Sequence, residues 1–212
     1  MTDDGETTRK DLAFLKALVS EGPKVQGTGG VIFMTAGLAY GLDCIAYWAQ
    51  MAFQIPLSLF MWRMLGLLPT LILFAVIAWV MWRNGKQGEQ GVATRALNAA
   101  YISGGMINLV IALIFGYVAT LEKSMLIWLL YPVVMCAFQG AIWYIAYMIR
   151  KKLWLAGVSA GWFATTLGLG LLVRDTQTYL LVLGIALIVL MGGAGWTLIA
   201  LNRRQLAGET RP

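Results

Sequence analysis

Hydrophobic residues fall in six long runs separated by short polar segments. The runs cover residues 30–49, 57–82, 96–120, 125–149, 153–173 and 179–201. A bilayer core about 30 Å thick requires a helix of about 20 apolar residues, and each run reaches that length. The pattern therefore predicts an all-α membrane protein with six transmembrane helices. It also allows an arrangement of three helical hairpins, because the first, third and fifth runs all open on small residues.

The links between the runs are short, which leaves no room for a further domain between them. We expect residues 1–29 to form a cytoplasmic N-terminal segment, residues 30–201 the six-helix transmembrane domain and residues 202–212 a cytoplasmic tail. Residues 1–29 are polar and lack the apolar core of a cleavable signal peptide. The first transmembrane run is therefore expected to act as the insertion signal.

Basic residues indicate how the helices are oriented. All of the 16 Lys and Arg residues except Arg63, Lys123 and Arg174 fall in segments that the six runs place on one side of the membrane. Cytoplasmic loops retain Lys and Arg, so this distribution predicts a multi-pass protein with both termini in the cytoplasm. Orientation and attraction to anionic lipid then account for the net charge of +6, without a direct nucleic-acid partner.

The composition argues against an enzyme. Hydrophobic residues make up 59% of the chain and charged residues only 12%, and histidine is absent. Without histidine there is no imidazole ligand for haem or zinc and no Ser–His or Cys–His pair. Cys44 and Cys136 both lie in apolar runs and do not form a CxxC pair, so each is interpreted as a small buried hydrophobic residue. We expect no metal and no cofactor.

Asp43 is a charged residue inside the first apolar run, "LAYGLDCIAYW". Tyr40, Asp43, Tyr47 and Gln50 share one helical face, which must turn toward protein or water because lipid offers no hydrogen bonds. Arg63 lies at a matching distance into the second run, so an intramembrane Asp43–Arg63 ion pair is predicted. Two interpretations stay open: the pair locks the first hairpin, or Asp43 binds a proton or a cation.

The third and fourth runs carry further polar residues. Asn98 and Asn108 lie on one face of the third run, and Gln139 lies near the centre of the fourth, after Pro132. Asn108 and Gln139 are candidates for a hydrogen bond across their hairpin. These residues either hold packed helices together or, beside a proline kink, line a cavity. The glycine-rich fifth and sixth runs predict close helix packing, within one chain or in a homo-oligomer.

The segment 8–21, "TRKDLAFLKALVSE", predicts a short amphipathic helix that ends at Gly22–Pro23. One interpretation is a helix that lies flat on the bilayer surface. The other is a helix that docks a cytosolic protein through an apolar face. The residues expected on that face are Leu12, Phe14, Leu15 and Leu18.

The opening "KDLAFLKALVSEG", followed by "GG" and a first transmembrane run, resembles the start of small multispanning membrane proteins of alphaproteobacteria. Those proteins are largely uncharacterised and are often paired with winged-helix or other small DNA-binding regulators. The resemblance covers about thirty residues and no catalytic motif. It implies a bacterial inner membrane and a transcription regulator as the cytosolic partner.

Two classes of function therefore remain. In the first, the protein is a regulatory or binding protein of the inner membrane that docks or restrains a cytosolic partner through its N-terminal helix. In the second, it is a small oligomeric transporter or channel that uses the polar faces of the first, third and fourth runs. A cavity along the polar face of the first run favours transport, whereas tight packing of that face favours a scaffold.

Overall fold

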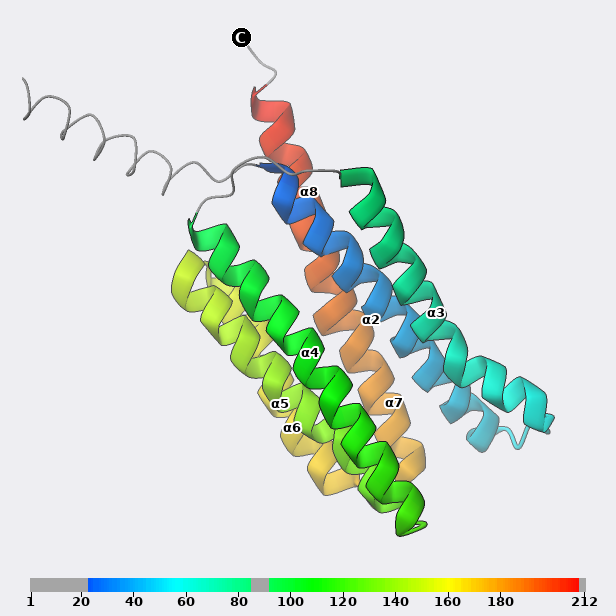
Figure 1. Ribbon diagram of the computed structural model, residues 1–212. Helices are drawn as coiled ribbons and strands as arrows, with labels where there is room; N and C mark the ends of the chain where they lie inside the picture. Colours follow the sequence, from blue (N-terminus) through cyan, green and yellow to red (C-terminus); the bar gives the residue numbers. More distant parts are fainter. Residues whose placement is uncertain (1–22, 85–91, 210–212) are drawn as a thin grey trace, which may run out of the picture.

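The structure is a computed structural model that describes residues 23–84 and 92–209 (Figure 1). It contains six helices long and apolar enough to cross a membrane, which confirms the predicted fold class. No strand occurs within the described residues. The predicted amphipathic helix at 8–21 lies outside them.

The helices extend beyond the predicted runs at several ends. Their bounds are α2 Pro23–Ala52, α3 Leu59–Asn84, α4 Val92–Leu121, α5 Met125–Arg150 and α6 Leu153–Leu172. The last transmembrane helix is continuous and consists of α7 Thr176–Ala186, the π-helical segment η1 Leu187–Gly192 and α8 Gly193–Glu209. A helix of 26 residues, such as α5, is about 39 Å long at 1.5 Å per residue, enough to cross the apolar core and enter the headgroup layers.

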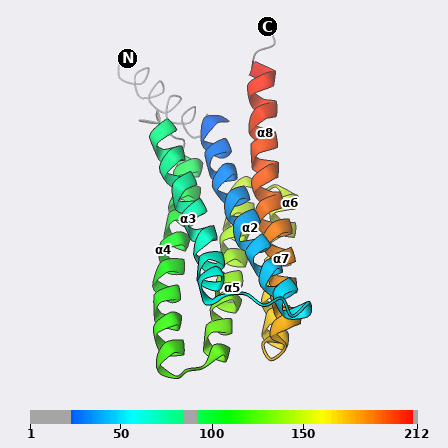
Figure 2. The same ribbon diagram turned by 90° about the vertical axis from the view of Figure 1, so that its right-hand side faces the viewer.

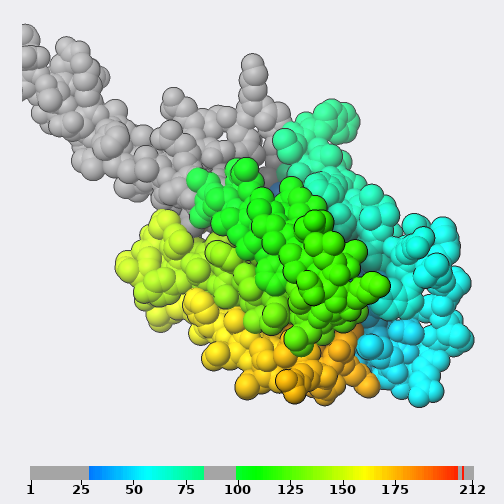
Figure 3. Space-filling model, turned by 60° about the horizontal axis from the view of Figure 1, so that its bottom comes forward, coloured from blue at the N-terminus to red at the C-terminus, as the bar shows by residue number. Residues whose placement is uncertain are grey.

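The two ends of the bundle differ in character (Figures 1 and 2). At one end α2 begins, α8 ends and Lys151–Lys152 connect α5 to α6; we call it the basic end. The other end holds the three short turns 53–58, 122–124 and 173–175, and we call it the turn end. Figure 3 brings the turn end forward and shows the α2–α3 side (cyan) and the α4 side (green) as neighbouring parts of the surface.

The two helices of each hairpin pack against each other, and two further interfaces, α2 with the last helix and α5 with α6, join the hairpins. α2 lies along the whole last helix, contacting α7, η1 and α8 as well as α3. α5 lies between α4 and α6, and α6 contacts α7. The spatial order is therefore α3, α2, last helix, α6, α5, α4, with α3 and α4 at its two ends.

Glycine permits the close contact between α2 and the last helix. A Cβ placed on Gly37 would overlap the backbone of Gly192, and one placed on Gly41 would lie 3.0 Å from the carbonyl oxygen of Gly184. The first of these crossings coincides with η1, where the Leu187 carbonyl oxygen also faces Gly37. Close approach of helix backbones is how membrane helices gain packing energy, because lipid tails already solvate apolar side chains.

The glycines of α6 pack less tightly than the sequence predicted. A Cβ on Gly161 would meet the flexible Leu190 side chain of η1, whereas nothing described lies within 4 Å of a Cβ on Gly157. The segment Gly192–Trp196 ("GGAGW") of the last helix, by contrast, does form a close-packing surface, and it packs against α2. The tightest glycine contact is therefore between the first and the last transmembrane helix.

An aromatic cluster joins four helices toward the basic end. Phe33 of α2 packs edge-on against Tyr101 of α4, with ring centroids 4.9 Å apart, and its ring lies 5.4 Å from that of Trp143 of α5. Trp143 in turn lies 6.2 Å from Trp154 of α6. Trp143 is completely buried, so this cluster forms the centre of the core at that depth.

Local interactions define the helix ends at the turns. Asp175 is the N-cap residue of α7, and its carboxylate accepts a hydrogen bond from the Thr178 amide at 3.2 Å. Because hydrogen bonds from Thr178 stabilise the ionised form, the pKa of Asp175 lies below its usual range. At the basic end, Lys151 adopts φ 53° and its amide donates to the Tyr147 carbonyl at 2.7 Å, which ends α5.

Candidate functional site

Asp43 lies half-buried on α2, inside the transmembrane part of the chain. Its Oδ1 atom is buried and has no hydrogen-bond partner. Gly37 and Gly41 turn toward the last helix, and the helical period of 100° per residue places Asp43 on the opposite side of α2. An unpaired carboxyl oxygen in this position is costly, which makes Asp43 the first candidate for a functional residue.

The predicted Asp43–Arg63 ion pair is not formed: between these two described residues, no carboxylate–guanidinium contact occurs, and Arg63 is exposed. The helix bounds explain the difference. Asp43 lies nine residues before the end of α2 at Ala52, whereas Arg63 lies only four residues after the start of α3 at Leu59. At 1.5 Å per residue, Asp43 is therefore about 7 Å deeper in the membrane than Arg63.

The contacts between α2 and α3 show the same register. The Tyr47 hydroxyl donates to the Trp62 carbonyl at 3.1 Å, and the Tyr40 and Thr70 hydroxyls are 3.0 Å apart. Asp43 lies between the two tyrosines on α2, so its level on α3 is between Trp62 and Thr70, about one turn past Arg63. The interhelical hydrogen bonds thus hold α2 and α3 in a register that keeps Arg63 away from the carboxylate.

Three residues of the predicted polar face of α2 make hydrogen bonds to α3 or to the turn that follows α2. Tyr40 and Tyr47 bond to α3, and the Gln50 side-chain amide donates to the Ile55 carbonyl at 3.3 Å. The face is turned toward protein, as its polarity requires. Thr70 was not among the predicted polar residues, although Thr70 lies seven residues after Arg63, two helical turns along the same side of α3.

The second polar group joins α4 and α5. The Tyr131 hydroxyl donates to Asn108 Oδ1 at 2.6 Å, in place of the predicted Asn108–Gln139 hydrogen bond. Gln139 Oε1 is buried and has no partner. Tyr131 lies in an apolar run, so the residue pattern alone does not single it out, yet its long phenol carries a hydroxyl deep enough to reach Asn108. Asn98 lies on α4, at a position where the structure does not describe the side chain.

The two polar groups lie at a similar depth. Tyr40 lies 12 residues before the end of α2 at Ala52, and Asn108 lies 13 residues before the end of α4 at Leu121. A further buried hydroxyl, that of Tyr179 on α7, donates to the Leu129 carbonyl of α5 at 2.6 Å. Most of these interior hydroxyls are therefore used to connect helices.

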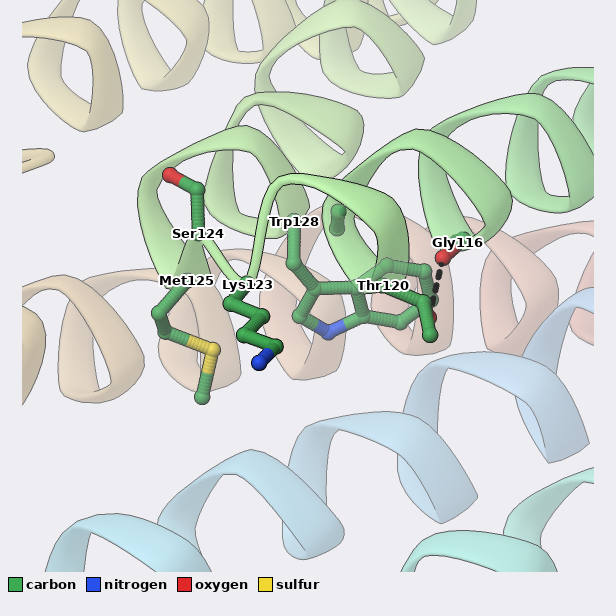
Figure 4. A pocket seen from close by; sticks show the side chains of 7 residues that line it. Gly116, Thr120, Lys123, Ser124, Met125 and Trp128 are labelled. Atoms are coloured by element: carbon green, nitrogen blue, oxygen red, sulfur yellow. Dashed lines mark hydrogen bonds between the residues drawn. The ribbon is translucent and has the colours of Figure 1, made fainter.

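The surface has a shallow, open depression between α4 and α5, which we call the cavity and which is not next to Asp43. The cavity has a volume of about 370 Å³ and lies at the turn end between α4 and α5 (Figure 4). Its lining consists of Gly116, Ala119, Thr120, Lys123, Ser124, Met125 and Trp128. The polar layer around Asp43 includes the interhelical hydrogen bonds of Tyr40, Tyr47 and Tyr131.

The remaining candidates from the sequence are metal ligands, the two cysteines and the docking residues. Among the described residues, no group of three His, Cys, Asp or Glu side chains is close enough to hold a metal ion. Cys44 and Cys136 are free cysteines, one half-buried and one buried. The predicted docking residues Leu12, Phe14, Leu15 and Leu18 lie outside the described residues.

Replacement of Asp43 with leucine is expected to leave the melting temperature unchanged or to raise it. The substitution removes a buried oxygen that has no partner, and such removal is close to neutral or stabilising. In a buried ion pair the same change would cost about 3–5 kcal/mol. Thermal unfolding in detergent measures the difference, with Arg63→Gln as the matched control. A large loss of stability in both variants would show that the two charges are paired after all.

The chain matches no protein-family model, no curated protein and no solved structure with which it was compared.

Proposed function

We propose that this protein is a regulatory or binding protein of a bacterial inner membrane that holds a cytosolic protein at its basic end. The observation that carries the proposal is the collection of basic side chains where α2 begins and α8 ends. These residues are Arg83, Arg150, Lys151, Lys152, Arg203 and Arg204. By the positive-inside rule this end faces the cytoplasm, and so do both termini.

The interior of the bundle supports this proposal. Several of its polar side chains connect helices: Tyr40 with Thr70, Tyr131 with Asn108, and the fully buried Tyr179 with the α5 backbone. The backbones of α2 and the last helix are in contact along their length. An interior of this kind suits a scaffold that presents its end surfaces. The predicted helix at 8–21 would place its apolar face beside the basic surface, because it joins α2 at this end.

A partner bound in this way would carry both an apolar groove and acidic residues. The groove would accept Leu12, Phe14, Leu15 and Leu18, and the acidic residues would complement the basic end. The resemblance of the N-terminal segment supports a small DNA-binding regulator as that partner. Restraint at the membrane would then keep the regulator away from its DNA.

Affinity purification from detergent-solubilised membranes tests the docking. The full chain is compared with a chain lacking residues 1–22 and with a Leu12→Ser, Leu15→Ser, Leu18→Ser variant. Both variants are expected to lose a partner that the full chain recovers in stoichiometric amount, and a peptide of residues 8–21 should displace it. A variant with Arg174→Gln at the turn end is the control and should retain the partner. Equal recovery by all of these chains would refute docking through the N-terminal helix.

The unpartnered Oδ1 of Asp43 favours a second candidate function, transport coupled to a proton or a cation. Reconstituted protein would then dissipate an imposed ion or pH gradient across vesicles. Asp43→Asn should abolish that flux without loss of folded protein, while Arg63→Gln should not change it. Wild-type vesicles that show no flux above protein-free vesicles would exclude this alternative for the ions tested.

A further inference from the structure

The cavity between α4 and α5 lies at the depth of lipid headgroups. α4 ends at Leu121 and α5 begins at Met125, so the turn 122–124 forms the tip of this hairpin. Trp128 is three residues into α5, about 5 Å below its start, where tryptophan marks the membrane–water interface. The cavity therefore opens between the headgroup layer and the first part of the acyl chains.

The charge of the cavity comes from one residue. Lys123 is the only ionisable side chain in the lining, and α5 has no acidic residue in its first turn. Glu122 precedes Lys123 in the turn but is not part of the lining. Figure 4 shows the Lys123 side chain extending to the same side as Met125 and Trp128, while the Ser124 hydroxyl points to the other side. A cation thus lies beside apolar and aromatic surface.

Most of the remaining lining is apolar, and the Thr120 hydroxyl already has a hydrogen-bond partner. The Thr120 hydroxyl donates to the Gly116 carbonyl at 2.7 Å, so its proton is used within α4. The Trp128 ring is stacked on Tyr131, with centroids 5.3 Å apart, which holds the indole in place. A Cβ on Gly116 would lie 3.5 Å from Trp128, so the absence of a side chain at Gly116 keeps this part of the cavity open.

We infer that this cavity binds the phosphate of an anionic phospholipid, with Lys123 as the cationic contact and the Gly116–Trp128 surface against the first part of an acyl chain. The cavity is open on one side, and its volume of about 370 Å³ is enough for a headgroup phosphate with its glycerol, while the rest of the lipid would lie outside it. In the orientation proposed above, this lipid belongs to the outer leaflet. The site itself does not depend on the proposed docking function, because it is at the opposite end of the bundle.

Native mass spectrometry of the full chain in detergent tests the site. The protein is titrated with phosphatidylglycerol, with phosphatidylcholine and with inorganic phosphate. The wild type is expected to prefer phosphatidylglycerol, and Lys123→Gln should reduce that preference about fivefold, the effect of one basic residue near an anionic headgroup. Lys123→Arg should restore it. Arg174→Gln, an exposed basic residue in another turn at the same end, is the matched control and should leave the preference unchanged.

Two further comparisons separate the sources of the phosphate. Gly116→Leu keeps the charge but fills the apolar part of the cavity, and it should weaken binding of phosphatidylglycerol. Inorganic phosphate should not displace the lipid at equal concentration. The inference is overturned if Lys123→Gln binds like the wild type or if Arg174→Gln loses as much preference. It is also overturned if Gly116→Leu has no effect or if inorganic phosphate competes on equal terms. Melting temperatures confirm that each variant is folded.

Discussion

Gly37→Ala is expected to separate α2 from the last transmembrane helix and to destabilise the bundle severely. The added methyl group would overlap the Gly192 backbone nitrogen, and the Leu187 carbonyl oxygen would be only 2.7 Å away. Backbone atoms cannot turn aside as side chains do, so the helices themselves must move apart. Overpacking in well-packed cores costs about 1–3 kcal/mol, and we expect about 3 kcal/mol or more at this contact. The folded fraction by size-exclusion chromatography and the melting temperature in detergent measure the loss.

Glycines in the same protein supply the comparison for this prediction. Gly195→Ala should behave like Gly37→Ala, because its Cβ would overlap the backbone of Met34 on α2. Gly157→Ala is the control, since no described atom lies within 4 Å of its Cβ, and alanine is the better helix former. If Gly37→Ala and Gly157→Ala unfold at the same temperature, α2 and the last helix do not meet at these glycines.

Trp143→Ala is expected to cost about 3–5 kcal/mol, the usual range for removal of a fully buried large aromatic side chain. Trp143 is 0% exposed and its ring contacts those of Phe33, Tyr101 and Trp154. Its removal would leave a cavity where α2, α4, α5 and α6 meet. Because lipid cannot fill an enclosed space of this kind, the contacts would be lost without replacement.

Trp82→Ala provides the matched control for Trp143→Ala. Trp82 is 85% exposed near the basic end of α3, so its substitution should change the melting temperature little. The two variants remove the same chemical group from the same protein and differ only in burial. Equal melting temperatures for both would show that the aromatic cluster is not part of the folded core.

The two proposals concern opposite ends of the molecule. The regulatory proposal uses the basic end, where the ends of α3, α5 and α8 bring Arg and Lys side chains together. The lipid inference uses the turn end, where Lys123 is the cation of a cavity. Asp43 is between them, deep in α2 and without a salt-bridge partner. The Asp43→Leu and Asp43→Asn variants therefore separate a structural role of this residue from a role in ion coupling.

The residue pattern alone predicted the membrane class, the six helices and the approximate position of each. Those properties depend on local chemistry: a run of about 20 apolar residues has to satisfy its backbone hydrogen bonds as a helix when it is surrounded by lipid. The residue pattern also predicted the polar face formed by Tyr40, Asp43, Tyr47 and Gln50, because helical periodicity places these residues on one side of α2.

Tertiary structure decided which residues meet. The sequence placed Asp43 opposite Arg63 by counting from assumed helix ends, and small errors at each end added up to more than one helical turn. It did not indicate that α2 pairs with the last helix, because Gly37 and Gly192 are far apart in the chain and glycine is common in all membrane helices. Hydrophobic patterns determine that a helix crosses the membrane, whereas helix partners and register depend on the shapes of surfaces that only the folded bundle brings together.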